Sequence, residues 1–161
     1  MQTVYIETSI LSFLRSKQSA HVVSAARQLL PRRWWDDERS KYELVTSQYV
    51  LDEASRGGAL LAAERMQALA GIPLVDLPDD IPSLADGLLA AAILPANARL
   101  DALHLCAASF HGVEYLLTWN CTHIANARIL PKVRRFLADQ GYTLPEVYTP
   151  EEMINDEYPI P

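Results

Sequence analysis

The sequence lacks a cysteine framework that could hold a small domain together covalently. Its 161 residues include only two cysteines, Cys106 and Cys121. Two cysteines in a chain of this size do not form a disulfide network, and their surroundings show no spacing typical of a zinc site. We interpret both as reduced thiols, so a hydrophobic core must stabilise the fold.

Segments that would direct the chain to a membrane are also lacking. The N-terminal residues do not combine a basic stretch with a following apolar stretch, as a secretory signal does. No apolar run reaches the length of a membrane span. The sequence therefore predicts a cytoplasmic protein that makes no contact with a membrane.

Positive charge is scarce. Fourteen basic residues face 20 acidic ones, which gives a formal net charge of −6. A protein that coats nucleic acid nonspecifically needs an excess of positive charge, because its affinity comes from neutralising phosphates. The balance argues against that class, but it does not exclude a nuclease, because carboxylates that hold a metal ion are themselves acidic.

Strand-like and helix-like segments alternate along the chain. β-Branched, aromatic and aliphatic residues predict strands at 3–6, 42–46, 72–77, 113–118 and 145–148. Helical spacing and capping residues predict helices between them, at 8–14, 20–38, 47–56, 59–70, 81–93, 99–110 and 129–140. We expect Pro31 to end or bend the second helix and the proline near the start of 72–77 to place that strand at an edge.

This alternation is typical of an α/β fold in which helices cover a mostly parallel sheet. The sequence shows no internal repeat and no linker. We therefore predict one domain over 1–150, followed by a short C-terminal tail over 151–161 that begins with a helical turn and ends loosely.

Four polar residues are expected to meet at one edge of the predicted sheet. Ligand sites of open parallel sheets lie at the carboxyl ends of strands, where the strand order reverses. Glu7 and Asn120 each follow a strand, and Glu53 and Asp101 lie on adjoining helices. Converging carboxylates repel one another unless a cation neutralises them, and oxygen ligands favour hard cations. We treat all four as catalytic, with Glu7, Glu53 and Asp101 as ligands of Mg²⁺ or Mn²⁺.

Each of these residues also has an ordinary explanation. Glu7 and Asp101 are acids at helix starts, where the helix dipole favours them. Glu53 on its own is a solvated helix residue, and Asn120 on its own is a turn former. The hypothesis therefore depends on the four residues as a set.

The segments around the four residues resemble the acidic motifs of PIN domains. They are 5–9 (YIETS), 50–54 (VLDEA), 101–104 (DALH) and 117–120 (LTWN), and they occur in the family's order. The strongest similarity is to the VapC-like toxins of bacterial toxin–antitoxin pairs. The resemblance implies a three-layer α/β/α sandwich with sheet order 3-2-1-4-5. It also implies a Mg²⁺- or Mn²⁺-dependent endoribonuclease that cleaves RNA, forms a homodimer and is inhibited by a cognate antitoxin.

The sequence departs from the family pattern at two positions. The family usually has Asp where this chain has Glu7, and Asp where it has Asn120. The loss of one carboxylate favours an alternative, a PIN-fold protein with weak or no catalysis that binds RNA or a protein partner. A flavodoxin-like small-molecule module is a third hypothesis, but no glycine-rich phosphate loop follows the first strand.

Several residues near the motifs are candidates for substrate binding: Thr8, Ser9, Thr118, His123, Arg56 and Arg99. Helix capping is the alternative for the two N-terminal hydroxyls, and a structural hydrogen bond is the favoured alternative for the histidine. His104 is expected to pack between the sheet and a helix. Other candidates for RNA contact are Arg15, Lys17, Trp34, Trp35 and Tyr49, although the two tryptophans could instead form a core, a dimer interface or an antitoxin groove.

Overall fold

A four-stranded, all-parallel sheet forms the centre of the molecule. The structure is a computed structural model that describes residues 1–14 and 20–154. The strands lie in the order β2-β1-β3-β4, and they are β1 (Thr3–Ile6), β2 (Glu43–Val45), β3 (Tyr115–Leu117) and β4 (Glu146–Tyr148). Val4, Tyr5 and Ile6 of β1 are completely buried, as expected for a central strand covered on both faces.

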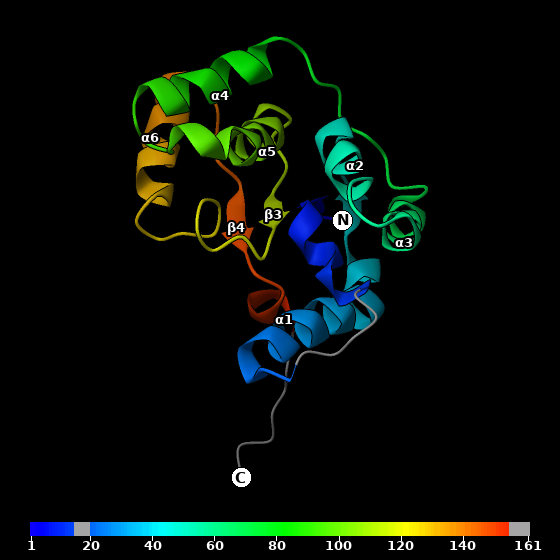
Figure 1. Ribbon diagram of the computed structural model, residues 1–161. Helices are drawn as coiled ribbons and strands as arrows, with labels where there is room; N and C mark the ends of the chain where they lie inside the picture. The colour runs from blue at the N-terminus through cyan, green and yellow to red at the C-terminus, as the bar shows by residue number, and fades with distance from the viewer. Residues whose placement is uncertain (15–19, 155–161) are drawn as a thin grey trace.

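Helices connect the strands and form two groups (Figure 1). The α-helices are α1 (Val22–Arg33), α2 (Gln48–Ala54), α3 (Ala59–Leu69), α4 (Asp80–Ala90), α5 (Arg99–Phe110) and α6 (Leu130–Asp139). Shorter helical segments are η1 (Thr8–Leu14), η2 (Trp34–Glu38), η3 (Arg39–Lys41), η4 (Ala96–Ala98) and η5 (Glu151–Met153). In Figure 1, α4, α5 and α6 lie together, apart from α1, α2 and α3. Right-handed crossovers from opposite halves of the sheet place such groups on opposite faces, which is compatible with a three-layer α/β/α fold.

The predicted fifth strand, 72–77, is wrong for the described part of the chain. Only a single parallel bridge forms there, between Thr46 and Leu74. The Thr46 amide donates to the Pro73 carbonyl at 3.0 Å, and the Val75 amide donates to the Thr46 carbonyl at 2.9 Å. Pro73 has no amide proton, so the segment cannot extend a regular ladder. The four strands that do form are in the expected order.

Pro31 does not end its helix, which was one of the two expected effects of this proline. Helix α1 continues to Arg33 and passes directly into the π-helical turn η2. Trp34 and Trp35 of this turn are buried, and their rings pack against Tyr42 and Phe13 at centroid distances of 6.1 and 5.6 Å. This anchoring compensates for the hydrogen bond that a helical proline removes. The two tryptophans therefore belong to the core and are not available to stack RNA bases or to contact a partner.

The strand order reverses between β1 and β3. From β1 the chain crosses to β2 on one side, whereas β3 and β4 lie on the other side. Glu7 directly follows β1, and its amide donates to the carbonyl of Leu117, the last residue of β3, at 3.2 Å. The carboxyl ends of these two strands are therefore adjacent, at the position where ligand sites of parallel sheets form.

The C-terminal tail begins as the sequence predicts. Residues 151–153 form the helical turn predicted at the start of the tail. The remainder of the tail, 155–161, and the candidate RNA contacts Arg15 and Lys17 lie outside the described residues. Within 1–14 and 20–154, none of the helices combines the length and apolar character needed to cross a bilayer.

The two cysteines are predicted to differ in reactivity. Cys106 on α5 is completely buried, and burial raises the pKa of its thiol to about 12, whereas Cys121 is exposed. Because the thiolate is the reactive form, we expect DTNB to modify one thiol of the native chain rapidly and two after unfolding in guanidinium chloride. Rapid reaction of both thiols in the native chain would contradict the packing of α5.

Candidate metal centre

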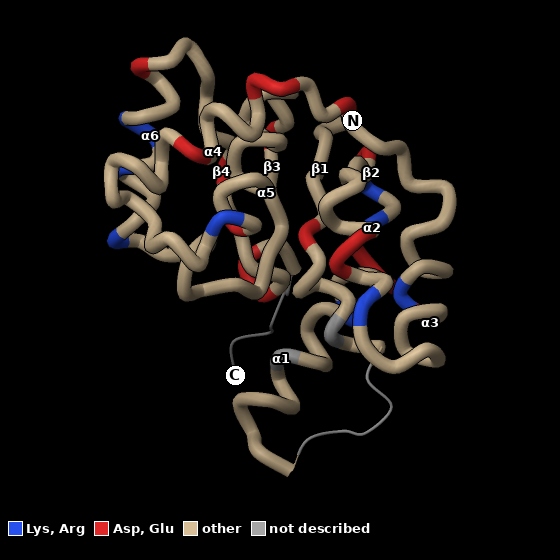
Figure 2. The backbone as a smooth tube through the Cα atoms, turned by 45° about the horizontal axis from the view of Figure 1, so that its top comes forward, with Lys and Arg blue, Asp and Glu red and all other residues tan. Residues whose placement is uncertain are grey.

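A cleft of about 550 Å³ opens beside the carboxyl end of β1. All four residues expected to be catalytic, Glu7, Glu53, Asp101 and Asn120, line it. Figure 2 shows acidic positions next to the end of β1 and on α2, with basic positions close by on the side of α2 and α3. The fold therefore brings together four residues that come from four separate segments of the sequence.

Glu7 is held in place by two hydroxyl groups. Only 4% of this residue is exposed, because it continues the buried strand β1. Thr118 donates to Glu7 Oε2 at 2.6 Å, and Ser9 donates to the same oxygen. The hydroxyls themselves accept hydrogen bonds from backbone amides, Ser9 from Trp119 at 2.7 Å and Thr118 from Asn120 at 3.0 Å. Ser9 and Thr118, which we predicted to bind substrate, thus orient the Glu7 carboxylate.

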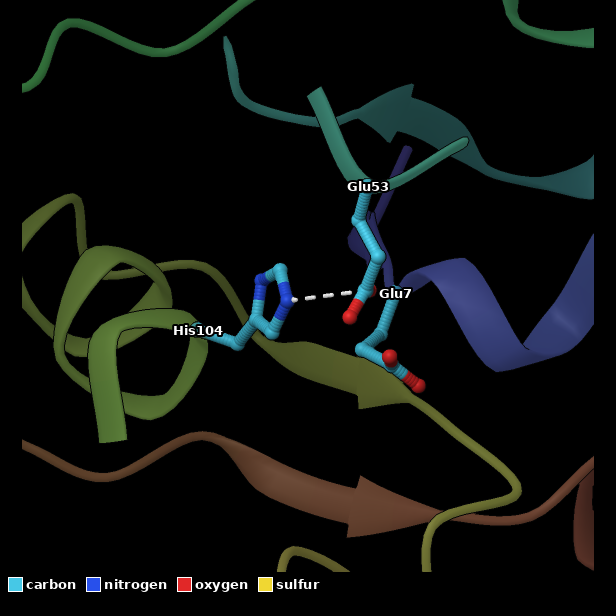
Figure 3. A group of neighbouring side chains, drawn as sticks. All are labelled: Glu7, Glu53 and His104. Atoms are coloured by element: carbon cyan, nitrogen blue, oxygen red, sulfur yellow. Dashed lines mark ion pairs between the residues drawn. The ribbon is translucent and has the colours of Figure 1, made fainter. Parts of the chain in front are cut away.

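A second carboxylate, that of Glu53, lies close to Glu7. Glu53 projects from α2, and its Oε1 is 3.6 Å from Nε2 of His104 on α5. One ligand atom from each of Glu7, Glu53 and His104 can be chosen so that all three lie within 4.8 Å of one another. Figure 3 shows the three side chains converging, with a dashed line for the Glu53–His104 ion pair. His104 packs in the interior, as expected from the sequence, but the sequence did not predict that its ring faces Glu53, which lines the cleft.

The surroundings of Glu53 favour its ionised form. Burial raises the pKa of this carboxyl, but the neighbouring His104 and Thr8 side chains and the charge of Arg56 outweigh that effect, so the pKa is lowered from its ordinary value. Among the described residues, Glu53 Oε1, His104 Nε2 and Thr8 Oγ1 are all buried without a hydrogen-bond partner. Buried polar atoms of this kind are rare and call for an explanation.

His104 is the end of a buried chain of hydrogen bonds. Its Nδ1 lies 3.0 Å from the Tyr5 hydroxyl, which lies 2.6 Å from Ser47 Oγ. Burial raises the pKa of Tyr5 far above its ordinary value, so the phenol keeps its proton. Tyr49 packs edge-on against the His104 ring at a centroid distance of 6.5 Å. Both tyrosines therefore help to fix the position of the imidazole.

Asp101 and Asn120 form a separate hydrogen-bonded group. Asn120 Nδ2 donates to Asp101 Oδ1 at 2.9 Å, and His123 Nδ1 lies 2.9 Å from Asp101 Oδ2. The side-chain oxygen of Asn120 accepts from the backbone amides of Thr122 and His123 at 3.2 and 3.0 Å. The four predicted residues are thus divided between two groups that line the same cleft, one containing Glu7 and Glu53 and the other containing Asp101 and Asn120.

The positive charge of the cleft comes from Arg56 and Arg65. The sequence analysis did not predict Arg65 as a cleft residue, because it lies on α3, the helix that follows the one carrying Glu53. Gly57, with φ of +91°, allows that turn, and Arg65 then donates to the carbonyls of Ala54 at 2.8 Å and of Arg56. Arg99, in contrast, pairs with Asp86 at 2.9 Å and lies outside the cleft lining.

Comparison of the chain with protein-family models, with curated proteins and with solved structures gave no match.

The hydroxyl of Thr118 is predicted to stabilise the fold through Glu7. Thr118→Val keeps the shape of the side chain but removes a donor to a buried carboxylate, which should lower the free energy of unfolding by about 1–3 kcal/mol. Urea unfolding measures this change. Thr122→Val is the control, because Thr122 is exposed and should change stability by less than about 0.5 kcal/mol. Equal effects of the two substitutions would contradict the role of the Thr118 hydroxyl.

Proposed function

We propose that this chain is a divalent-metal-dependent endoribonuclease with a PIN-like three-layer α/β/α fold. The observation that supports the proposal most strongly is the close approach of Glu7 and Glu53 in a cleft at the reversal of strand order. Two carboxylates at this separation repel each other, and a cation between them removes the repulsion. The resemblance of the four motif segments to those of PIN domains supports the same function.

The residues present fit a divalent cation such as Mg²⁺ or Mn²⁺. Glu7 offers a carboxylate fixed by Ser9 and Thr118, and Glu53 offers a buried oxygen that lacks a partner among the described residues. Asp101 lines the same cleft and completes the predicted ligand set. A bound divalent cation supplies Lewis-acid activation of a phosphodiester and of a water molecule.

Two arginines that line the cleft, and a histidine bonded to Asp101, are suited to act on RNA. Arg56 and Arg65 lie where they can bind phosphate oxygens, and guanidinium groups match phosphates in shape and charge. Asp101 orients the His123 ring through Nδ1, so that Nε2 is the nitrogen that contacts a phosphate or exchanges a proton with it. In this proposal the two arginines of the cleft bind phosphate, and His123, held by the cleft residue Asp101, transfers the proton.

The proposal includes the toxin role, with a homodimer and a cognate antitoxin as partners. Helix α1 exposes three aliphatic side chains, Val22, Val23 and Leu29, at 85%, 67% and 60%. Aliphatic surface of this kind is commonly covered in a complex. This surface, and not the buried Trp34–Trp35 pair, is the one that fits such a partner.

A second candidate function is a PIN-fold protein that binds RNA without efficient cleavage. One observation favours it, because both oxygens of Asp101 already have partners in Asn120 and His123. If these bonds persist, Asp101 contributes less to metal binding and only two carboxylates hold the ion. Cleavage and metal-binding measurements distinguish the two functions.

The nuclease is tested by RNA cleavage with purified protein and Mn²⁺. We expect chelation of the metal, Glu7→Gln or Glu53→Gln to lower the cleavage rate at least about 100-fold, because each removes charge that stabilises the transition state. Asp52→Asn is the matched control, since Asp52 is the exposed neighbour of Glu53 on α2 and its side chain accepts a hydrogen bond from Gln48. Its rate should stay within about twofold of the parent chain.

The outcome separates the candidate functions. Cleavage that persists in chelator, or equally in Glu7→Gln, would show that the activity comes from another site or from a contaminant. RNA binding without cleavage by the metal-loaded chain would favour the binding protein over the nuclease.

Asn120→Asp is predicted to make stability dependent on metal. The new carboxylate oxygen would replace Nδ2, which now donates to Asp101, and would face a like charge instead. We expect a lower Tm without metal, by about 2–4 °C for each kcal/mol lost, and a larger increase in Tm on adding Mn²⁺ than in the parent chain. Calorimetric titration should also show tighter Mn²⁺ binding. Unchanged metal dependence would mean that position 120 lies outside the metal site.

A further inference from the structure

His104 combines complete burial with a ring nitrogen that forms no hydrogen bond and whose ion-pair neighbour Glu53 is 3.6 Å away. Its exposed fraction is 0%, and Nε2 forms no hydrogen bond with the residues that the structure describes. The ring points from α5 toward Glu53 and Glu7 (Figure 3). A buried imidazole nitrogen normally finds a donor or an acceptor, so an unpartnered one that faces two carboxylates indicates a missing ligand.

The distance between His104 and Glu53 fits a shared cation better than a hydrogen bond. Nε2 and Glu53 Oε1 are 3.6 Å apart, which is beyond the usual range of N–H···O bonds. Two ligands that each lie about 2.1 Å from one metal ion are separated by up to about 4.2 Å, depending on the angle between them. The three ligand atoms all lie within 4.8 Å of one another, which is close to this limit. A small movement of a glutamate side chain would therefore bring all three within bonding distance of one ion.

The hydrogen-bond chain behind the ring can hold the tautomer that binds metal. The Tyr5 hydroxyl lies between Ser47 Oγ and His104 Nδ1, so it can donate to one neighbour and accept from the other. When Tyr5 donates to Ser47 Oγ, it accepts from Nδ1–H of His104, and Nε2 then carries a free lone pair. A histidine that binds metal almost always donates its other N–H in this way.

We propose that His104 Nε2 is a metal ligand, and that with Glu7 and Glu53 it forms a mixed nitrogen–oxygen site for a first-row transition cation of the Mn²⁺, Fe²⁺ and Co²⁺ class. An imidazole ligand favours such cations over Mg²⁺, which prefers oxygen ligands and retains its water. The inference deepens the proposed function, on which it rests only for placing a cation in this cleft. Under this assignment the site selects its metal by a residue outside the acidic set.

The experiment measures metal binding without RNA. Co²⁺ is titrated into the metal-free chain and followed by its visible absorption, and calorimetry compares Mn²⁺ with Mg²⁺. We expect Mn²⁺ to bind more tightly than Mg²⁺ in the parent chain. His104→Ala should weaken Co²⁺ and Mn²⁺ binding by more than about 100-fold. Tyr5→Phe, which removes the hydroxyl between Ser47 and Nδ1 of His104, should weaken it by about 10–100-fold.

His111→Ala is the control for loss of a histidine. His111 follows the last residue of α5 and contacts the Asp76 carbonyl at 2.6 Å. It should leave Co²⁺ affinity and absorption unchanged. Circular dichroism and thermal unfolding establish whether each variant is folded before its affinity is compared.

A measurement on the unsubstituted chain keeps the inference testable if His104→Ala does not fold. ¹⁵N NMR of the metal-free chain should show a proton on Nδ1 of His104 and none on Nε2. Titration with Zn²⁺, a diamagnetic probe, should then shift the Nε2 resonance far more than that of His111. A proton that remains on Nε2 in the loaded chain, or equal affinity for Mn²⁺ and Mg²⁺ in the parent and a folded His104→Ala chain, would overturn the assignment.

These results are independent of catalysis. Normal Co²⁺ binding through His104 without RNA cleavage would contradict the nuclease function but support the metal site. Cleavage that requires Glu7 and Glu53, but that Mg²⁺ supports as well as Mn²⁺ in folded His104→Ala, would support the nuclease function and contradict His104 as a metal ligand.

Discussion

The buried carboxylate of Glu7 is the constraint around which the site is built. It continues a strand whose three preceding residues are completely buried, and only 4% of Glu7 is exposed, so the chain must supply polar partners for its carboxylate. Ser9 and Thr118 supply them, and both hydroxyls are in turn held by amides at the end of β3. The carboxyl ends of β1 and β3 are therefore linked through one carboxylate as well as through the sheet. Because Glu is one methylene longer than Asp, the carboxylate reaches these hydroxyls while it still lines the cleft.

The second group of the cleft shows why an amide suits position 120. The Asn120 oxygen accepts two backbone amides and so organises the turn after β3, while its nitrogen donates to Asp101. A carboxylate could perform the first task but not the second. Asp101 in turn holds the ring of His123. The departure from the PIN pattern is thus accompanied by a complete local network, which assigns Asn120 to the orientation of Asp101 and His123 rather than to the addition of charge.

Much of the fold could be predicted from local patterns, because buried parallel strands and amphipathic helices have clear signatures. Residues 99–110 were predicted as a helix with the bounds that α5 has, and the strand at 3–6 matches β1. Segment 72–77 has the same apolar character, but Pro73 removes an amide that a regular ladder needs, so only a bridge forms. The proline is visible in the sequence and predicted an edge position, but it did not predict that the pairing would shrink to a single bridge. The course of α1 past Pro31 depends on tertiary packing of Trp34 and Trp35, which no local pattern contains.

The sequence identifies a site residue when that residue directly follows a predicted strand, because the carboxyl ends of parallel strands lie together. Glu7 and Asn120 could be located in this way, but His104 could not, because a histidine within an apolar helix has the pattern of a core residue. Its position three residues after Asp101, on the same helical face, was the available signal. Arg65 reaches the cleft only because the turn at Gly57 brings α3 back against the end of α2. A residue that is brought to the site by a turn and a following helix has no characteristic spacing in the sequence from the other site residues, so the sequence alone does not identify it.

The unpartnered atoms of the cleft connect its chemistry to the stability of the fold. Leaving a buried polar atom unsatisfied costs about 1–3 kcal/mol, and Glu53 Oε1 and His104 Nε2 both have this state in the described residues. A ligand present at 100 times its Kd stabilises the native state by about 2.7 kcal/mol when it does not bind the unfolded chain. The two quantities are similar in size, so a cation between Glu7, Glu53 and His104 would offset most of the cost of building the site. Under the proposed function, the same arrangement would make the stability of the native state depend on the concentration of the metal ion.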